Sequence, residues 1–584
     1  MEKFEIKEGF VMKKLFVHMK GYYKECIISP LFKMLEACFE LFVPIVVASI
    51  IDVGIPNKDT GYIVKMCLIM VALGVIGLCC TLIAQYYAAK AAVGFTGKMR
   101  SALFKHINSL SYTELDTLGT PTLITRMTSD MNQVQTGVNL TLRLLMRSPF
   151  VVFGAMIMAF IVDAKASWIF AVLIPVLCVV VFGIMLGTIP LYKKVQARLD
   201  GVVTSSRDNL AGIRVIRAFG KEESEKQAFY QKTSELNYAQ RFVGRISAIM
   251  NPATYAIVNL AIVVLIYNGA LRVEMGNLTQ GQVIALYNYM SQILIELVKL
   301  ASLIITITKS VACGNRIQGV FEVKSSQEVV PCESTYDTQN AVEFKGASLM
   351  YNGASECSLE NVTFSVKKGQ TVGIIGGTGS GKSSLVNMIG RFYDAHSGQV
   401  LVNGKDVKSY ELDDLREKLG IVPQKAVLFK GTIRDNMKWG NENASDEEIL
   451  DAIELAQASD VLASKEGGLD SYIEQGGKNL SGGQRQRFTI ARALVRKPEI
   501  LILDDSSSAL DYQTDARLRS AISKIDYNPT VFIVSQRTTS IQHADLIIVL
   551  DDGEVVGMGK HNDLLDSCVV YSEIYSSQFK KEGN

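Results

Sequence analysis

Long apolar stretches alternate with charged segments over the first 322 residues of the 584-residue chain. A helix needs roughly 20 residues to cross a bilayer, and buried helices of water-soluble proteins usually carry shorter apolar runs. We therefore predict six transmembrane helices, near residues 27–51, 66–87, 144–162, 168–189, 246–267 and 283–307.

Basic residues indicate the orientation of these helices. Lysines and arginines recur throughout residues 193–245, between the fourth and fifth predicted spans, whereas the turn at residues 163–166 contains only Lys165. Because loops rich in lysine and arginine stay on the cytoplasmic side of a membrane, we expect the long loops to be cytoplasmic. An even number of spans returns the C-terminal region to the same side, which predicts a multi-pass protein of the plasma (inner) membrane.

The pattern changes after residue 322. Residues 323–340 are polar and contain Pro331, as is typical of a linker. Beyond them, short apolar runs of strand length alternate with helical patterns, as they do in α/β domains. The expected architecture is an all-α six-helix transmembrane domain over residues 1–322, a linker over residues 323–340 and an α/β domain over residues 341–584.

Composition and charge narrow the classes of partner. The formal net charge of +2 is close to neutral, so composition gives no reason to expect a nucleic acid. Five of the ten cysteines fall inside predicted spans, and no spacing typical of metal ligands occurs. We interpret the cysteines as small hydrophobic residues.

A glycine-rich loop follows one of the predicted strands of the α/β domain. Residues 371–385 read TVGIIGGTGSGKSSL, an apolar strand that leads into the pattern of a P-loop. Backbone N–H groups of such a loop converge on phosphate oxygens, Lys382 would reach the β- and γ-phosphates, and the Ser383 hydroxyl would bind Mg²⁺. The expected nucleotide contacts are Gly376, Gly377, Thr378, Gly379, Ser380, Gly381, Lys382, Ser383 and Ser384.

A second motif makes the prediction more specific. Residues 479–494 read NLSGGQRQRFTIARAL, and here the chain resembles the ATP-binding cassette (ABC) family, whose signature is matched by Leu480, Ser481, Gly482, Gly483 and Gln484. Six spans followed by one cassette resemble the layout of an exporter-type half-transporter. The resemblance implies ATP as the nucleotide, Mg²⁺ as its metal, and residues 341–584 as the cassette.

The same resemblance implies roles for four further residues. Tyr351 matches the aromatic residue that stacks on adenine, and Gln424 the glutamine that senses Mg²⁺ and the γ-phosphate. Asp504 closes an apolar strand and matches the aspartate that holds Mg²⁺ through water, and Asp511 matches the D-loop aspartate. In the membrane domain, residues 112–130 and 211–223 resemble the coupling regions that transmit cassette closure to the spans.

Two positions depart from the family pattern. The family usually has a catalytic glutamate where this chain has Asp505, and a γ-phosphate-contacting histidine where it has Gln536. The aspartate carboxylate retreats by about 1.5 Å, and a misplacement of roughly 1 Å can cost about a hundredfold in rate. Glutamine cannot carry a positive charge or relay a proton as histidine can. We therefore expect a degenerate site that binds ATP and hydrolyses it poorly.

A chain with an intact signature and a degenerate P-loop side of its ATP site resembles one subunit of a heterodimeric, multidrug-type bacterial exporter. Its partner would be a second half-transporter that carries the glutamate and histidine. Alternatives are a homodimer, an importer built on the exporter-like fold, and a regulatory or channel-like protein in which ATP gates passive flow. Glu296 and Lys299, three residues apart in the sixth span, are interpreted equally well as a structural pair or as cargo contacts.

Overall fold

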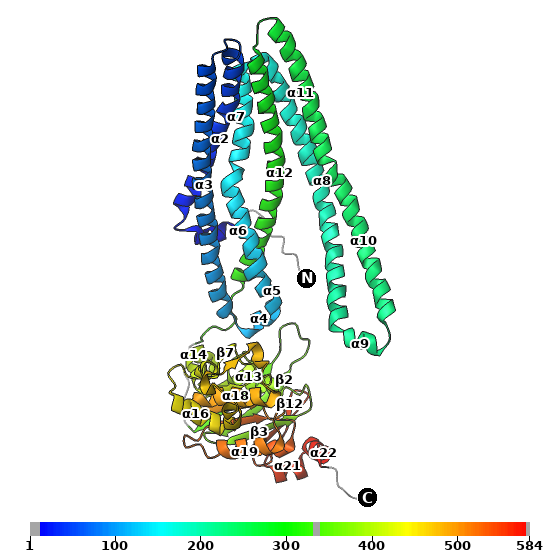
Figure 1. Ribbon diagram of the computed structural model, residues 1–584. Helices are drawn as coiled ribbons and strands as arrows, with labels where there is room; N and C mark the ends of the chain where they lie inside the picture. Colours follow the sequence, from blue (N-terminus) through cyan, green and yellow to red (C-terminus); the bar gives the residue numbers. More distant parts are fainter. Residues whose placement is uncertain (1–11, 331–338, 580–584) are drawn as a thin grey trace. The chain divides into compact units, whose positions relative to one another are not determined.

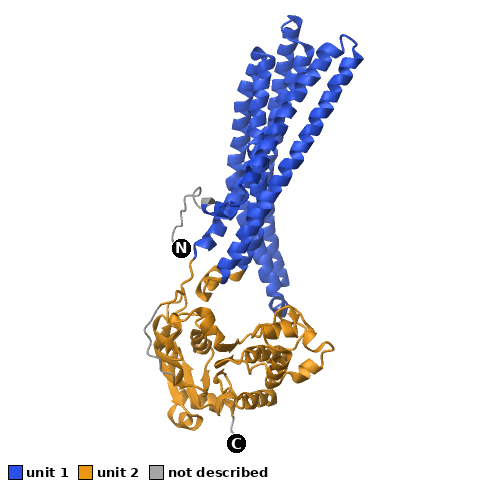
Figure 2. Cartoon of the chain, turned by 90° about the vertical axis from the view of Figure 1, so that its left-hand side faces the viewer, with its two compact units in different colours: residues 1–108, 121–323 blue, residues 109–120, 324–584 orange. Residues whose placement is uncertain are grey.

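The computed structural model describes residues 12–330 and 339–579. Its contacts divide the chain into two compact units (Figure 2). The first comprises Met1–Asn108 and Pro121–Val323, and the second comprises Ser109–Thr120 and Lys324–Asn584. A short segment from between two membrane helices therefore belongs to the same compact unit as the C-terminal domain. Pro331 and the rest of residues 331–338 of the predicted linker lie outside the described residues.

The described residues of the first unit form helices joined by short turns (Figure 1). Its helices and helical turns are α1 (Met12–Leu15), η1 (Phe16–Met19), α2 (Tyr23–Ser49), η2 (Ile50–Gly54), α3 (Thr60–Asn108), α5 (Thr120–Thr125), η3 (Arg126–Asp130), α6 (Met131–Leu140), η4 (Thr141–Leu145), α7 (Arg147–Val162), α8 (Ala164–Ala211), α9 (Ile213–Ala218), α10 (Glu222–Ala248), α11 (Met250–Glu274) and α12 (Gln280–Glu322). Within the described residues, 6 helical stretches are long and apolar enough to cross a membrane, which confirms the predicted spans. They are Tyr23–Gly54, Thr60–Asn108, Thr120–Val162, Ala164–Ala211, Glu222–Glu274 and Gln280–Glu322.

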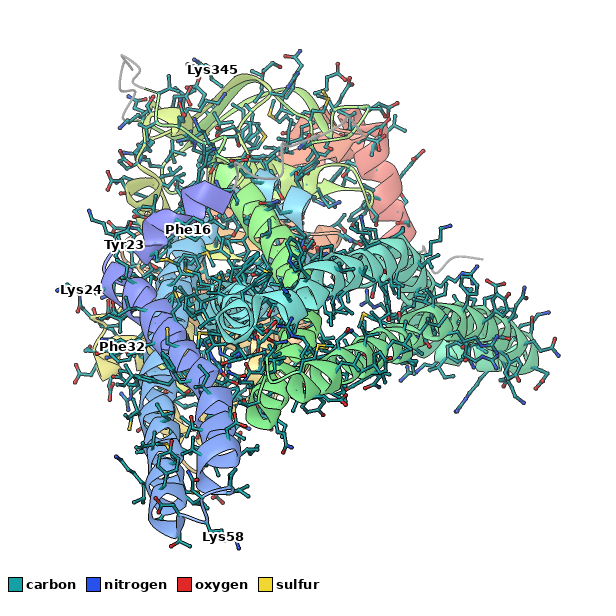
Figure 3. The ribbon with its side chains drawn as sticks, turned by 90° about the horizontal axis from the view of Figure 1, so that it is seen from above. Phe16, Tyr23, Lys24, Phe32, Lys58 and Lys345 are labelled. Carbon is teal, nitrogen blue, oxygen red and sulfur yellow. The ribbon has the colours of Figure 1, made fainter. Side chains whose placement is uncertain are left out.

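The outer face of α2 is apolar, as is typical of a helix that lies in a lipid bilayer. Tyr23, Ile27, Leu31 and Leu35 recur at every fourth position and are all exposed. Figure 3 labels Tyr23 at the start of this helix and Lys58 in the turn that follows it. Residues four apart lie on one face of a helix, so the exposed side chains form a continuous apolar stripe that is suited to lipid.

The opposite face of α2 packs against α3 through small residues. Ala84, Ala88 and Ala91 of α3 are fully buried, and the Ser29 hydroxyl donates a hydrogen bond of 2.9 Å to the Ala84 carbonyl oxygen. Small side chains let two membrane helices approach closely, and a hydroxyl can then bond across the interface. The sequence of α3 therefore favours a tight helical hairpin with α2.

A chain of alternating charges joins α2, α7 and α12. Glu296 is only 3% exposed, and it accepts hydrogen bonds from Arg147 at 2.6 Å, Ser148 at 2.8 Å and Lys299 at 2.9 Å. Arg147 also donates to Glu40 at 2.6 Å. Charged groups inside a membrane are costly unless they pair, and here each buried charge has at least one partner of opposite sign.

The C-terminal domain is built around two main sheets, and its strands are given in spatial order. The antiparallel sheet consists of β2 (Leu359–Lys367), β1 (Asn340–Leu349), β4 (Ser397–Val402) and β5 (Lys405–Asp406). The larger sheet consists of β12 (Glu554–Gly559), β11 (Leu546–Asp551), β3 (Thr371–Gly376), β10 (Thr530–Val534), β9 (Ile500–Asp504) and β6 (Leu419–Val422). A small hairpin pairs β7 (Gly431–Thr432) with β8 (Tyr472–Ile473).

Helices cover these sheets and complete the predicted α/β domain. They are α13 (Lys382–Ile389), α14 (Leu412–Glu417), α15 (Ile433–Lys438), α16 (Asp446–Leu455), α17 (Ser459–Ala463), α18 (Gly482–Val495), α19 (Tyr512–Ile522), α20 (Thr538–Ile541), α21 (His561–Ser567) and α22 (Val569–Gln578). The second unit also contains α4 (Tyr112–Leu118), from the segment between two membrane helices. The fold is therefore the predicted six-span domain followed by an α/β domain.

Strand pairing brings three strand ends to one edge of the larger sheet. β10 lies between β3 and β9 and pairs in parallel with both. Val534, the last residue of β10, is level with Ile374 of β3 and with Asp504 of β9. Loops that leave the carboxyl ends of these strands therefore begin close together, as ligand-binding loops of parallel sheets do.

The charge chain supports a prediction about stability. Replacing Arg147 by Met keeps an unbranched side chain but leaves the buried carboxylate of Glu296 with less compensating charge. We expect Arg147→Met to lower the free energy of unfolding by about 3–5 kcal/mol. The measurement is denaturant unfolding in detergent micelles. The control is Lys226→Met, because Lys226 forms an exposed 3.4 Å pair with Glu223; equal losses in both variants would contradict the prediction.

Candidate functional site

A cavity of about 350 Å³ lies at the edge of the larger sheet where β3, β9 and β10 end. The residues that line it come from several separate segments of the chain. The predicted site residues among them are Tyr351, Thr378, Gly379, Gly381, Lys382, Ser383, Ser384, Gln424, Asp504, Asp505 and Gln536. Folding therefore gathers most of the predicted P-loop side of the site into one cavity.

Close backbone approach explains the glycines of the P-loop. Gly379 and Gly381 have φ values of 90° and 91°, a region that other residues rarely adopt. A Cβ atom on Gly376 would lie 2.1 Å from the Leu550 carbonyl oxygen, and one on Gly381 would lie 2.6 Å from the Ser358 carbonyl oxygen. Side chains at these positions would push the loop away from the sheet.

Lys382 is the cation of the cavity. Its ammonium group donates to the carbonyl oxygens of Gly376, at 3.0 Å, and Gly377. Burial lowers the pKa of Lys382, although the nearby carboxylates of Asp505 and Asp504 oppose the shift. The half-buried ammonium is therefore placed to bind an anion in a region of reduced solvation.

Asp504 and Ser383 form a pair of oxygen ligands. The carboxylate of Asp504 is nearly buried, and it accepts a hydrogen bond of 3.0 Å from the Ser383 hydroxyl. Burial raises the pKa of Asp504, while the bond from Ser383 opposes the shift. Gln424 lines the same cavity. This set of hard oxygen donors fits Mg²⁺, which commonly takes one or two carboxylates together with substrate phosphates.

Asp505 occupies an unusual backbone conformation. Its φ is 44°, in the left-handed region, and its N–H donates to the Val534 carbonyl oxygen at 3.0 Å. The Gln424 side-chain N–H group donates to its carboxylate at 3.4 Å. Left-handed backbone at a non-glycine residue is uncommon and is concentrated at functional sites. The carboxylate of Asp505 is thus held at the wall of the cavity by Gln424 and by β10.

Gln536 follows β10 and lines the same cavity. The side chain of Gln578, the last residue of α22, donates to the Gln536 carbonyl oxygen at 2.7 Å and accepts from the Thr538 N–H at 2.9 Å. The C-terminal helix therefore fixes the backbone on both sides of Arg537. Gln578 could not be predicted from the sequence, because nothing in the local pattern of α22 indicates a contact 42 residues away.

The signature residues lie outside this cavity at the start of α18. The Ser481 hydroxyl accepts from the Gln484 N–H at 3.3 Å, and the Gln484 side-chain oxygen accepts from the Ser481 N–H at 3.0 Å. This reciprocal pair is a capping box, which fixes where the helix begins. Apart from its own chain neighbours and helix backbone, no heavy atom of the described residues lies within 4 Å of the position that a Cβ on Gly482 would take. The side of Gly482 at the start of α18 is therefore open.

Asp511 likewise lies outside the cavity and caps a helix. Its carboxylate accepts from the Thr514 N–H at 3.0 Å and from the Thr514 hydroxyl at 2.7 Å, which fixes the start of α19. These bonds hold the pKa of Asp511 below its usual value. The structure therefore gives this predicted D-loop residue a defined local role as a helix cap.

Part of the first predicted coupling region packs within the second unit. The Tyr393 hydroxyl donates to Asp116 of α4 at 2.6 Å, and the Asn352 side chain donates to Thr117 at 3.2 Å. The ring of Tyr393 also lies edge-on to that of Tyr351, with centroids 4.9 Å apart. Tyr351, at the wall of the cavity, thus contacts Tyr393, and Tyr393 in turn bonds α4. The second predicted coupling region, with α9, belongs to the first unit.

Comparisons with known proteins agree with this geometry. Residues 26–297 match the family described as ABC transporter transmembrane region, and residues 359–508 match the family described as ABC transporter. The chain is 35% identical over 568 residues to an uncharacterized ABC transporter ATP-binding protein of Mycobacterium bovis, covering 96% of this chain and 97% of that protein. It is 28% identical over 571 residues to the ATP-dependent lipid A-core flippase of Vibrio vulnificus, covering 97% of each.

A solved structure shares the fold. The structure of a bacterial Atm1-family ABC exporter with ATP bound superimposes with a TM-score of 0.80, covering 97% of this chain and 100% of that chain at 22% identity. At this level of identity the similarity concerns the fold alone. It agrees with the six spans and the α/β domain described above.

The position of Tyr351 supports a prediction about nucleotide affinity. Its ring borders the cavity and its hydroxyl lies 2.9 Å from the Ser384 hydroxyl. Stacking of a base on an aromatic ring contributes about 1–3 kcal/mol, so Tyr351→Ala should weaken ATP binding about tenfold or more. Tyr351→Phe keeps the ring and should bind nearly as the wild type does. Equilibrium binding of a fluorescent ATP analogue measures both, and equal weakening in the two variants would contradict a stacking role.

Proposed function

The chain belongs to the ABC transporter family, and we propose that it is the degenerate-site subunit of a heterodimeric exporter that moves its substrate by alternating access. It is a multi-pass protein of the inner membrane, and its nucleotide-binding domain is cytoplasmic. The observation that carries the proposal is the cavity that combines a P-loop, Asp504 and Gln424 with Asp505 and Gln536. The same chain supplies six spans through which a substrate can pass.

ATP would bind with its adenine on Tyr351 and its phosphates along the P-loop. Lys382 would contact the β- and γ-phosphates, and the N-terminal end of α13 adds a favourable field for negative charge. Ser383, Gln424 and Asp504 would hold Mg²⁺. Mg²⁺ held by these residues would supply positive charge to offset the negative charge of the phosphates.

Hydrolysis at this site would be slow because Asp505 and Gln536 are poorly suited to activate water. The shorter Asp505 side chain is held near Gln424, and it leaves a carboxylate further from the attacking water than a glutamate would. Gln536 offers an amide in place of an ionisable imidazole. Because Asp505 and Gln536 both assist hydrolysis poorly, this site would retain ATP rather than hydrolyse it.

The signature supports a partner with a competent site. ABC cassettes close as head-to-tail pairs, in which one chain's P-loop faces the other chain's signature. The capping box occupies the N–H groups of Ser481 and Gln484. The N–H groups of Gly482 and Gly483, which lie between them, would contact the γ-phosphate of the partner's ATP together with the Ser481 hydroxyl. This chain would thus assist hydrolysis at the partner's site while its own site stays occupied.

The names of two similar proteins support a proposal about the direction of transport and the class of substrate. One relative is named as an ATP-dependent lipid A-core flippase, and the solved structure with the same fold is named as an exporter. We therefore favour export or flipping of an amphipathic molecule across the inner membrane. Uphill flux measured in sealed vesicles tests this direction, because import or ATP-gated passive flow would give the opposite sign or no accumulation.

The assignment of the two sites predicts unequal effects of two substitutions. Ser481→Arg should abolish ATP hydrolysis by the heterodimer, since it blocks the partner's site and adds a misplaced charge. Asp505→Asn should change hydrolysis little, because it alters a site that already turns over slowly. Each variant is purified with its wild-type partner and assayed for phosphate release at saturating ATP. Loss of nearly all turnover in Asp505→Asn with full activity in Ser481→Arg would show that the assignment is reversed.

Restoring the family residues provides a gain-of-function test. The double variant Asp505→Glu with Gln536→His supplies a longer carboxylate and an imidazole, and general acid–base groups commonly contribute about 10²–10⁴-fold. We expect the chain purified without its partner to hydrolyse ATP at least about tenfold faster after this change. The single variant Gln536→His is the control. No gain in the double variant would mean that some other feature limits hydrolysis at this site.

A further inference from the structure

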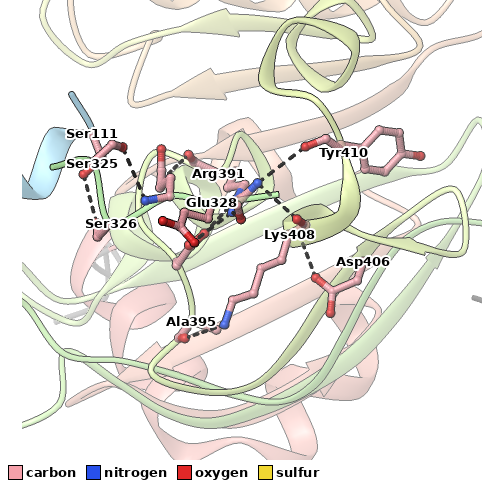
Figure 4. A network of polar contacts seen from close by, with 11 residues as sticks. Ser111, Ser325, Ser326, Glu328, Arg391, Ala395, Asp406, Lys408 and Tyr410 are labelled. Carbon is pink, nitrogen blue, oxygen red and sulfur yellow. Dashed lines mark hydrogen bonds and ion pairs between the residues drawn. The ribbon is translucent and has the colours of Figure 1, made fainter. Parts of the chain in front are cut away.

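The first residues of the linker are folded against the cassette. After α12 ends at Glu322, residues 324–330 belong to the second unit. The Val330 N–H donates to the Lys408 carbonyl oxygen at 2.9 Å, and the Gln327 side chain donates to the Arg391 carbonyl oxygen at 2.8 Å. These contacts hold this part of the linker in place at two positions. Figure 4 shows the neighbouring network, in which Glu328, Arg391 and Lys408 are labelled.

Arg391 is at the centre of this network. It is only 1% exposed, and it follows the end of the P-loop helix α13 by two residues. Its guanidinium group donates to the carbonyl oxygens of Glu328 at 2.8 Å and Lys408 at 3.3 Å. It also donates to the Asp394 carboxylate at 2.9 Å, which compensates the buried charge. The same side chain therefore bonds the linker, the segment before Tyr410 and its own turn.

The linker also contacts the segment that carries α4. The Ser326 hydroxyl lies 3.2 Å from that of Ser111, the residue before α4. Glu114 accepts from the Ser111 N–H at 3.0 Å. Hydrogen bonds from Ser111 and Ser326 keep the pKa of Glu114 below its usual value, although burial opposes this shift. Two segments that each lead directly to a membrane helix are thus bonded to each other.

We propose that Arg391 is a positioning residue that fastens linker residues 324–330 and, through them, the α4 segment to the C-terminal end of the P-loop helix. The proposal rests on the proposed function, because it assigns a role in coupling ATP binding to transport. Lys382 begins α13 at the phosphate end, and Arg391 follows its opposite end. A displacement of the P-loop on nucleotide binding then moves the linker with it.

The geometry explains why arginine is required at this position. A guanidinium group has five N–H donors in a fixed plane, so it can bond a carboxylate and several carbonyl oxygens at once, whereas lysine presents a single ammonium. Helix α13 has 8 residues and spans about 12 Å, so it acts as a short rigid connection. Without the guanidinium, the Glu328 carbonyl oxygen loses its bond. The linker is then held less firmly, by the bonds of Gln327 and Val330 to backbone carbonyl oxygens.

The test compares four variants of the full-length chain, each purified with its wild-type partner in lipid nanodiscs. They are Arg391→Ala, Arg391→Lys, Gln327→Ala and the control Arg496→Ala. Arg496 donates to the carbonyl oxygens of Gly440, at 3.1 Å, and Arg416, so its loss removes comparable bonds at a position away from the linker. Hydrogen exchange of residues 109–120 and 324–330 is measured with and without a non-hydrolysable ATP analogue and Mg²⁺. The kcat and KM for ATP are measured in parallel.

We expect the analogue to slow exchange in both segments of the wild type and of Arg496→Ala. Arg391→Ala should speed linker exchange about tenfold and abolish its response to the analogue. Its kcat should fall, with the KM for ATP within about twofold of the wild type. Arg391→Lys should restore part of the response. Gln327→Ala, the milder change, should give an intermediate result and keeps the test possible if Arg391→Ala does not fold.

Three results would overturn the proposal. The first is a change in hydrogen exchange of residues 324–330 on binding of the analogue that is the same in Arg391→Ala as in the wild type. Where Arg391→Ala does not fold, the same result in Gln327→Ala counts. The second is a KM for ATP that rises as much as kcat falls, which would indicate local damage to the P-loop. The third is an equal loss of response in Arg496→Ala. Failure of the wild-type complex to bind or hydrolyse ATP would instead contradict the proposed function, so the two failures are distinguishable.

Discussion

Parallel pairing of β3, β10 and β9 is the constraint on which the nucleotide site depends. The side chains of the P-loop, Asp504 and Gln536 come from positions far apart in the sequence. They meet because three adjacent strands run in the same direction and end within two residues of the same level. A shift of one residue in β9 would point Asp504 to the other face of the sheet. The fully buried strands on either side of β10 oppose such a shift, because it would displace apolar side chains from both cores.

The elements that could be predicted from the sequence are those with a strong local signal. Six long apolar stretches predicted six spans, and the glycine pattern around Lys382 predicted a loop between a strand and a helix, because both depend on residues close in sequence. Contacts between distant residues left no such signal. Gln578 holds the backbone beside Gln536 from the last described helix, and Arg391 bonds a carbonyl oxygen 63 residues earlier. Every residue type offers a backbone carbonyl oxygen, so the pattern of residue types could not indicate which of these oxygens would be bonded.

The buried charges in the membrane domain illustrate the same limit. Spacing alone placed Glu296 beside Lys299, and it left a structural pair and a cargo contact equally open. The structure adds Arg147 and Ser148 from α7 to Glu296, and it adds Glu40 from α2 to Arg147. Since Glu296 is bonded by three partners and almost inaccessible, its first role is to join helices. Lys299, whose side chain is 47% exposed, keeps a free face. A contact with cargo would therefore involve Lys299 before Glu296.

The cassette and the linker are connected by the same short helix that begins at the phosphate site. Under the proposed function, a nucleotide retained at this site would still act on α13, because phosphate binding does not require hydrolysis. The hydrogen bonds of Arg391 and Gln327 join α13 to residues 324–330, and Ser326 lies beside the segment before α4, so the proposed effect would reach both segments. Retained ATP would thus keep both connections to the membrane helices ordered while the partner's site cycles. The proposed function thus accounts for an intact P-loop beside Asp505 and Gln536: a site that hydrolyses ATP slowly would still hold the nucleotide as a structural ligand.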